Sequence, residues 1–149
     1  MRQYLNPFRL TTLLLLLYCL GHTLGALVSA PQFGAESGAV MAAMKSVHFS
    51  ANGSDCTWFG FYMGFGYDVS IFLLFSAVLT WFLGGLSLPD QRRWAPITWA
   101  LFVTYTATAV LAATYFFAVA IVFSSLIAVL LGIQGIKLTR APRTTQSQR

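Results

Sequence analysis

The sequence predicts an all-α integral membrane protein: a four-helix bundle with an extra amphipathic outer helix. Three observations predict this class. Of the 149 residues, 57% are hydrophobic and only 9% are charged, whereas soluble domains have about 25% charged residues. Four stretches are apolar and long enough to cross a bilayer, which takes about 20 residues. The basic residues that flank these stretches fall mostly on one side.

The composition also excludes several classes of protein. A disordered segment and a nucleic-acid-binding module both need more charge than this chain has. A small disulfide-stapled secreted domain needs more than the two cysteines, Cys19 and Cys56. A membrane protein with no nucleic-acid partner remains, and its net charge of +5 has to be interpreted by position relative to the bilayer.

The chain is predicted to form a single transmembrane domain, 1–149. An uncharged run over 94–136 is too long for one helix and long enough for two. We place the break near Ala112, although no Gly or Pro marks it. The predicted segments are spans over about 8–30, 61–86, 94–112 and 115–136, an outer segment over 31–60 and a basic cytoplasmic tail over 137–149.

The distribution of basic residues predicts the orientation. Lys45 falls on one side of the predicted spans, and the other basic residues fall on the side of both termini. Because cytoplasmic flanks are enriched in Lys and Arg, both termini are predicted to be cytoplasmic in a multi-pass protein of a bacterial inner (plasma) membrane. The basic residues on that side are Arg2, Arg9, Arg92, Arg93, Lys137, Arg140, Arg143 and Arg149.

The outer segment is predicted to contain a helix over 35–50. Val40, Met44 and Val47 recur at helical spacing there, with polar residues between them. Such a helix would lie flat on the outer surface, either as a lid over the bundle or as a connection that packs on its rim. Asn52-Gly53-Ser54 then predicts a turn.

His22 and Asp68 are the two ionisable residues predicted to lie deep within spans, where a charge is costly. Both lie roughly 10–12 Å below the outer surface at about 1.5 Å per residue. Equal depth on sequential antiparallel helices predicts contact between them. The same depth offers hydroxyls, so the predicted ligand-binding residues are His22, Asp68, Tyr67, Tyr18 and Tyr62, with His48 added from the outer helix; Thr23 and Ser70 supply further hydroxyls.

Four roles for His22 and Asp68 remain open. In the first, they form a structural clasp; in the second, they form the polar end of a pocket for a lipid-like or quinone-like ligand. Alternatively, they form the acid/base pair of an enzyme acting on a lipid, sterol or quinone, with the carboxylate orienting the imidazole. Proton movement is disfavoured, because the polar groups do not continue into the inner half. We expect a small accessory or hydrophobic-ligand-binding protein surrounded by membrane lipids.

No metal or cofactor is predicted. His22 and His48 are the only histidines in the sequence, and no Cys-x-x-Cys or His-x-x-His spacing occurs. A metal site would need the outer helix to fold over the bundle and bring His48 to His22. The cysteines are predicted not to pair with each other, because Cys19 lies within a span and Cys56 lies outside it.

Small residues accompany both candidate site residues. Gly21-His22-Thr23-Leu24-Gly25 and Gly64-Phe65-Gly66 would let helices approach closely, within one chain or between copies in a homo-oligomer. With these patches, its length and its four spans, the chain resembles the small four-helix membrane proteins of bacteria that include the DoxX-like proteins. The resemblance implies a topology and no defined activity.

The N-terminal segment tests the four-span prediction. Arg2, Arg9 and the following apolar run imitate a signal peptide that would be cut after Val28-Ser29-Ala30. We expect the segment to be retained, because Pro31 would follow the cut and the apolar stretch reaches about 20 residues, long for a signal peptide. Mass spectrometry of the membrane-extracted protein should find the first span present. A mature chain that begins at Pro31 would contradict the four-span prediction.

Overall fold

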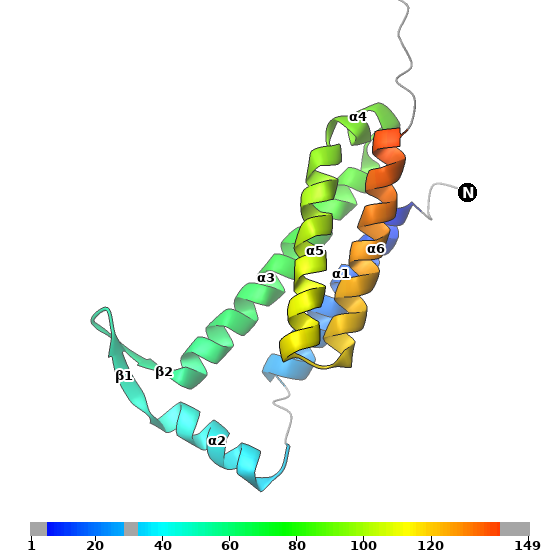
Figure 1. The fold of residues 1–149 in the computed structure, drawn as a ribbon. Coiled ribbons are helices and arrows are strands. Elements are labelled where there is room, and N and C mark those ends of the chain that lie inside the picture. Colours follow the sequence, from blue (N-terminus) through cyan, green and yellow to red (C-terminus); the bar gives the residue numbers. More distant parts are fainter. Residues whose placement is uncertain (1–5, 29–32, 141–149) are drawn as a thin grey trace, which may run out of the picture. The chain divides into compact units, whose positions relative to one another are not determined.

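The computed structural model describes residues 6–28 and 33–140 (Figure 1). The all-α class is confirmed, and four helices of the described chain are long and apolar enough to cross a membrane, as expected of a multi-pass membrane protein. In chain order, the elements are α1 (Pro7–His22), a π-helix η2 (Thr23–Val28), α2 (Ala35–Ser46), β1 (His48–Ala51), β2 (Ser54–Thr57), α3 (Trp58–Gly85), α4 (Leu88–Arg93), α5 (Ala95–Tyr115) and α6 (Ala118–Arg140).

The chain divides into two compact units whose boundary falls within α1 and α3. Unit 1 combines the chain up to Leu15 with the chain from Ser76 onward, and unit 2 is Leu16–Phe75. Unit 1 therefore holds α4, α5 and α6, and unit 2 holds the π-helix, α2 and the two strands.

In unit 1, α5 and α6 form an antiparallel hairpin with α4 at one end (Figure 1). Two buried glycines on α6 face two aromatic rings on α5. A Cβ on Gly132 would lie 3.0 Å from Phe102 Cε2, and a Cβ on Gly135 would lie 2.9 Å from Trp99 Cε2. The two rings meet edge to face, with centroids 5.4 Å apart. The helices can therefore approach closely because α6 has no side chain where α5 has its largest ones.

Two pairs of buried polar side chains in unit 1 are hydrogen-bonded. Thr12 Oγ1 on α1 lies 2.9 Å from Thr80 Oγ1 on α3. The side-chain amide of Gln134 on α6 donates to Gln91 Oε1 on α4, at 3.2 Å. Each interhelical hydrogen bond within a membrane contributes about 0.6 kcal/mol on average. These two pairs join α1 to α3 and α6 to α4.

Two connections differ from prediction. The break expected near Ala112 comes later, since α5 continues to Tyr115 and Phe116 ends it in an extended conformation. No Gly, Pro or capping side chain marks this break, which explains the error. The loop expected between the second and third spans contains α4 instead, where Ser87 accepts a hydrogen bond from the Asp90 N–H at 3.4 Å. A Ser N-cap with Pro in the first turn is a signal for a short helix.

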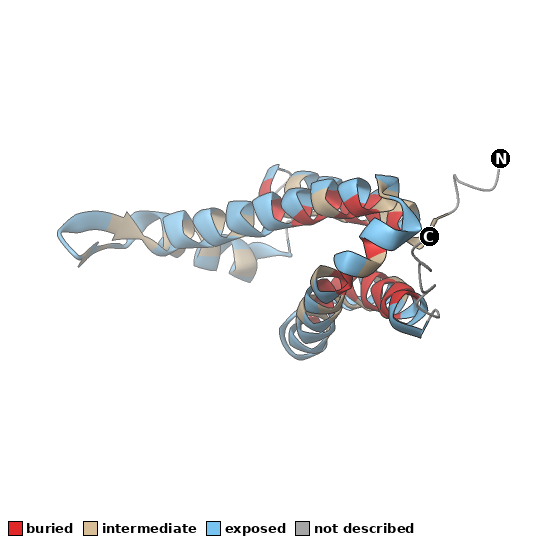
Figure 2. Cartoon of the chain, turned by 90° about the horizontal axis from the view of Figure 1, so that it is seen from above, coloured by how far each residue is buried: buried red, intermediate tan, exposed pale blue. Residues whose placement is uncertain are grey.

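The outer segment also differs from prediction. The helix expected over 35–50 ends at Ser46, and the following residues form an antiparallel hairpin of β1 and β2. The predicted turn is present, with positive φ at Asn52 (51°) and Gly53 (82°), as in the two-residue turns that connect hairpin strands. Neither α2 nor the hairpin contains a buried residue (Figure 2). The predicted cleavage site and the tail beyond Arg140 lie outside the described residues.

The α5–α6 contact gives a stability test. We expect Gly135→Ala to lower the free energy of unfolding by about 1–3 kcal/mol, because the new methyl group overlaps the Trp99 ring. Gly21→Ala is the matched control, since nothing lies within 4 Å of a Cβ there. Thermal or SDS-induced unfolding in micelles measures both variants. Equal loss of stability in the two would contradict the close contact.

Candidate functional site

Ser70 is the centre of a hydrogen-bonded cluster in unit 2. Its hydroxyl lies 3.0 Å from His22 Nδ1 and 2.9 Å from Thr23 Oγ1. The Cys19 thiol donates to the Ser70 carbonyl at 3.4 Å, and the Thr23 hydroxyl also donates to the Cys19 carbonyl at 2.8 Å. The side chain of His22 is therefore hydrogen-bonded where α1 and η2 pack against α3, with Ser70 as the partner that the clasp hypothesis assigned to Asp68.

The predicted contact between His22 and Asp68 is wrong. An α-helix turns about 100° per residue, so Asp68 and Ser70 point about 200° apart on α3. Because His22 bonds to the Ser70 side, Asp68 faces away from it. Asp68 is exposed and has no hydrogen bond or ion pair with another side chain in residues 6–28 and 33–140. Equal depth in two spans was not sufficient to predict a contact, because it leaves the helical face undetermined.

The glycines near His22 and Asp68 also differ in whether another helix packs against them. On α3, Gly66 lies against Leu27 of η2, whose methyl group fills the space that a Cβ on Gly66 would take. By contrast, nothing lies within 4 Å of a Cβ on Gly21, Gly25 or Gly64. Gly66 and Ser70, four residues apart, therefore form the packed side of α3, while Gly64 belongs to an open side.

Two shallow hollows follow that open side of α3 and share Phe61. The larger, about 440 Å³, includes the end of β2, and the smaller, about 190 Å³, includes Asp68. Their α3 residues recur every three or four positions, so they belong to one helical face. The lining residues are Asp55, Cys56, Thr57, Gly60 and Phe61 in the first, and Phe61, Gly64, Phe65 and Asp68 in the second. We call this face the Asp68 groove.

Sequence reasoning missed the Asp68 groove. Gly60, Gly64 and Asp68 stand at i, i+4 and i+8, a spacing that was available as a signal. The prediction instead grouped Asp68 with His22 by depth. Phe61 and Phe65, which form the walls, have no polar atom that would have drawn attention to them.

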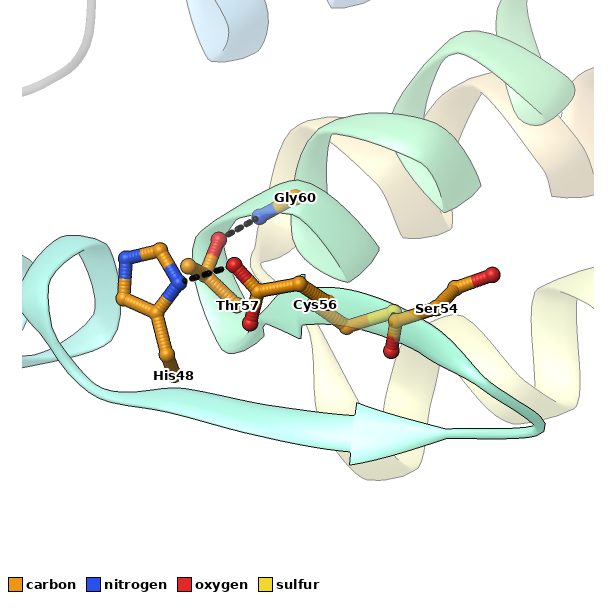
Figure 3. A network of polar contacts seen from close by, with 6 residues as sticks. His48, Ser54, Cys56, Thr57 and Gly60 are labelled. Carbon is orange, nitrogen blue, oxygen red and sulfur yellow. Dashed lines mark hydrogen bonds and ion pairs between the residues drawn. The ribbon is translucent and has the colours of Figure 1, made fainter.

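His48 bonds to Asp55 within the outer hairpin, whereas His22 bonds to Ser70. His48 Nδ1 lies 2.7 Å from Asp55 Oδ2, and both side chains are more than half exposed. Figure 3 shows the His48 imidazole turned toward the second strand near Thr57, whose hydroxyl accepts the Gly60 N–H at 3.0 Å and caps α3. Within the described residues, no three His, Cys, Asp or Glu side chains gather as metal ligands would.

The predicted tyrosines have three different environments. The Tyr62 hydroxyl donates to the Ala26 carbonyl of η2 at 3.4 Å, which ties α3 to the π-helix. Tyr67 is exposed on α3, and Tyr18 is half-buried on α1. None of these tyrosines lines the Asp68 groove.

No family model, curated protein or solved structure matches this chain. The function therefore has to be inferred from the geometry of the described residues. That geometry separates a bonded cluster around Ser70 from an open groove that contains Asp68.

The clasp role of Ser70 can be tested against a serine on the same helix. We expect Ser70→Ala to lower the free energy of unfolding by about 1 kcal/mol, because it leaves His22 and Thr23 without their common partner. Ser76→Ala should leave stability unchanged or raise it, since the buried Ser76 hydroxyl has no partner in the described chain. Unfolding in micelles measures both, and equal stabilities would contradict the clasp.

Proposed function

We propose that the chain is a small accessory membrane protein that binds a hydrophobic molecule in the Asp68 groove. The molecule is lipid-like or quinol-like and has a hydroxyl or amine that donates a hydrogen bond to Asp68. The observation that carries this proposal is the exposed Asp68 carboxylate, which has no partner in the described chain although α3 is apolar enough to cross a membrane. A charged group at that depth needs a partner.

The length of α3 indicates that Asp68 lies within the hydrocarbon core. A helix of 28 residues is about 42 Å long, which exceeds the hydrocarbon core by about 12 Å. Asp68 comes ten residues after Trp58, or about 15 Å along the helix. Even if the whole excess projected at the Trp58 end, Asp68 would still lie about 3 Å inside the core.

The walls of the groove suit an apolar ligand. Phe61 and Phe65 supply aromatic surface, and Gly64 lets a flat molecule approach the α3 backbone. A carboxylate accepts hydrogen bonds, so we propose a ligand that supplies the donor. A sterol, a quinol, a diacylglycerol or an amine-bearing lipid has such a donor.

The enzyme alternative, with His22 and Asp68 as an acid/base pair acting on a lipid, sterol or quinone, has less support. His22 bonds to Ser70, and Asp68 points to another side of α3. An acid/base pair needs its two groups within hydrogen-bond reach of each other or of one substrate atom.

Native mass spectrometry of the protein extracted from its own membrane tests the proposal. We expect the wild-type chain to retain a lipid-like molecule and Asp68→Leu to lower its occupancy by at least about tenfold, because a hydrogen bond to a charged group is lost. Glu36→Gln, which alters an exposed carboxylate on α2, is the control and should retain the molecule.

The same variant distinguishes a ligand site from a clasp. Asp68→Leu should leave thermal stability unchanged or raise it, because it removes an unpaired carboxylate from an apolar span. If Asp68→Leu lowers stability and retains the molecule at wild-type occupancy, the ligand proposal fails.

A further inference from the structure

Unit 2 contains most of the acidic residues of the chain and almost none of the basic ones. Glu36, Asp55 and Asp68 lie in residues 16–75, where Lys45 is the single Lys or Arg. Asp55 lines the larger hollow of the Asp68 groove and Asp68 lines the smaller, whereas no Lys, Arg or His of the described chain lines either hollow. The formal charge of the groove is therefore negative, although the whole chain has a net charge of +5.

Lys45 contacts a different side of α3. Its Nζ lies 4.6 Å from the centre of the Phe59 ring, a cation–π contact. Phe59 and Phe61 are two residues apart in the sequence, so they point about 200° apart around the helix. Phe61 lines both hollows, and Phe59 lines neither. The basic residue of unit 2 is therefore held away from the groove, and the groove carboxylates have no Lys or Arg of the described chain as a counter-charge.

The two groove carboxylates differ in whether they have a partner. Asp55 Oδ2 lies 2.7 Å from His48 Nδ1, whereas Asp68 has no ion pair or hydrogen bond with another side chain of the described residues. The N-terminal end of a helix favours anions, but that effect falls off within the first turn. Asp68 comes ten residues after Trp58, where α3 begins. Asp68 is therefore the carboxylate that is available to a cation.

The walls beside Asp68 suit a small cationic head group. Phe61 and Phe65 line the smaller hollow, and their ring centroids lie 6.0 Å apart at an interplanar angle of 48°. Aromatic rings attract cations with their faces and offer apolar surface to an alkyl chain. Pockets for drug-sized ligands usually measure about 300–1,000 Å³, but this hollow measures about 190 Å³. An ammonium group on a flexible chain therefore suits it better than the rigid ring system of a sterol or a quinol does.

We propose that the ligand of the Asp68 groove is an amphiphile with a protonated primary amine and an alkyl chain. This inference rests on the proposed function and selects the amine-bearing lipid over the sterol, the quinol and the diacylglycerol. A primary amine, like the lysine side chain, is protonated near pH 7, so it gives Asp68 both a counter-charge and N–H donors. The head group contains no phosphate, because no Lys or Arg of the described chain lines the groove to pair with one.

Two amphiphiles that differ only in the head group test this inference. Radiolabelled oleylamine and oleyl alcohol have the same chain and each has a hydrogen-bond donor, but only the amine is a cation near pH 7. We expect the full chain in nonionic micelles to bind oleylamine at least about tenfold more tightly than oleyl alcohol, because only the amine pairs its charge with a carboxylate. Equilibrium gel filtration measures both affinities.

Asp68→Asn separates the charge from the hydrogen bond. The amide keeps the size of the side chain and a carbonyl acceptor but has no charge. We expect Asp68→Asn to bind the two amphiphiles with affinities equal to within about twofold, because the amine has lost its counter-charge. Glu36→Gln, which removes an exposed carboxylate of α2, is the matched control and should keep the wild-type preference for oleylamine.

The possible results distinguish this inference from the proposed function. Failure of the wild type to bind oleylamine, equal wild-type affinities for the two amphiphiles, or a preference that Asp68→Asn keeps would overturn the inference. If Asp68→Leu then lowers the affinity for oleyl alcohol, a neutral donor is sufficient and the proposed function stands. If Asp68→Leu binds both amphiphiles as the wild type does, the proposed function fails as well.

A salt titration of the wild type covers a failure of Asp68→Asn to fold. Asp68 is exposed, so salt screens its attraction for a cation, with a Debye length of about 10 Å at 0.1 M and about 3 Å at 1 M. We expect the affinity for oleylamine to fall by at least about twofold between these concentrations and the affinity for oleyl alcohol not to fall. An equal response of the two amphiphiles to salt would count against a charge pair at Asp68.

Discussion

The structure depends on one constraint: a polar group within an apolar span needs a partner, because hydrocarbon offers none. Many polar side chains of the spans form hydrogen bonds with other groups of the same chain. Thr12 pairs with Thr80, Gln134 pairs with Gln91, and the His22 imidazole pairs with Ser70. Many hydroxyls of the spans also bond to a carbonyl one turn earlier, as Thr104 and Thr106 do. Against this background, the groups that lack internal partners are informative.

Two groups that have no hydrogen-bonding partner within the described residues, Asp68 and Arg9 Nη1, differ in kind. Asp68 is exposed beside aromatic rings, so it favours a ligand that is mostly apolar with one donor. Arg9 Nη1 is buried and has no hydrogen bond within the described residues, and its guanidinium lies over the Trp81 ring. Both groups lie on helices that pack through small residues. Glycine thus serves two purposes here: Gly66 and Gly135 receive a neighbouring side chain, while Gly64 and Gly85 leave open or shared space beside a charge.

Hydropathy predicted the four long helices to within a few residues, because the requirement to span hydrocarbon acts on every residue of a span. The errors lie where structure depends on contacts or on local geometry. The break at Phe116 has no capping signal, and the hairpin after Ser46 depends on a two-residue turn at Asn52 and Gly53. The site was predicted only in part. His22 and Asp68 were identified by their rarity, but Ser70 as the partner of His22 depends on which face of α3 meets α1.

The junction of the outer hairpin with α3 has a mechanical consequence. Strand β2 ends at Thr57 and α3 begins at Trp58, with no linker between them. The Thr57 hydroxyl caps the first turn of the helix, and Phe49 of β1 contacts the Trp58 and Phe61 rings at centroid distances of 4.8 and 5.7 Å. The hairpin therefore continues directly into α3 and packs against its first turn. Because a helix of this length tilts in response to bilayer thickness, a change of thickness would displace the turn at Asn52 and Gly53, the end of the hairpin farthest from α3.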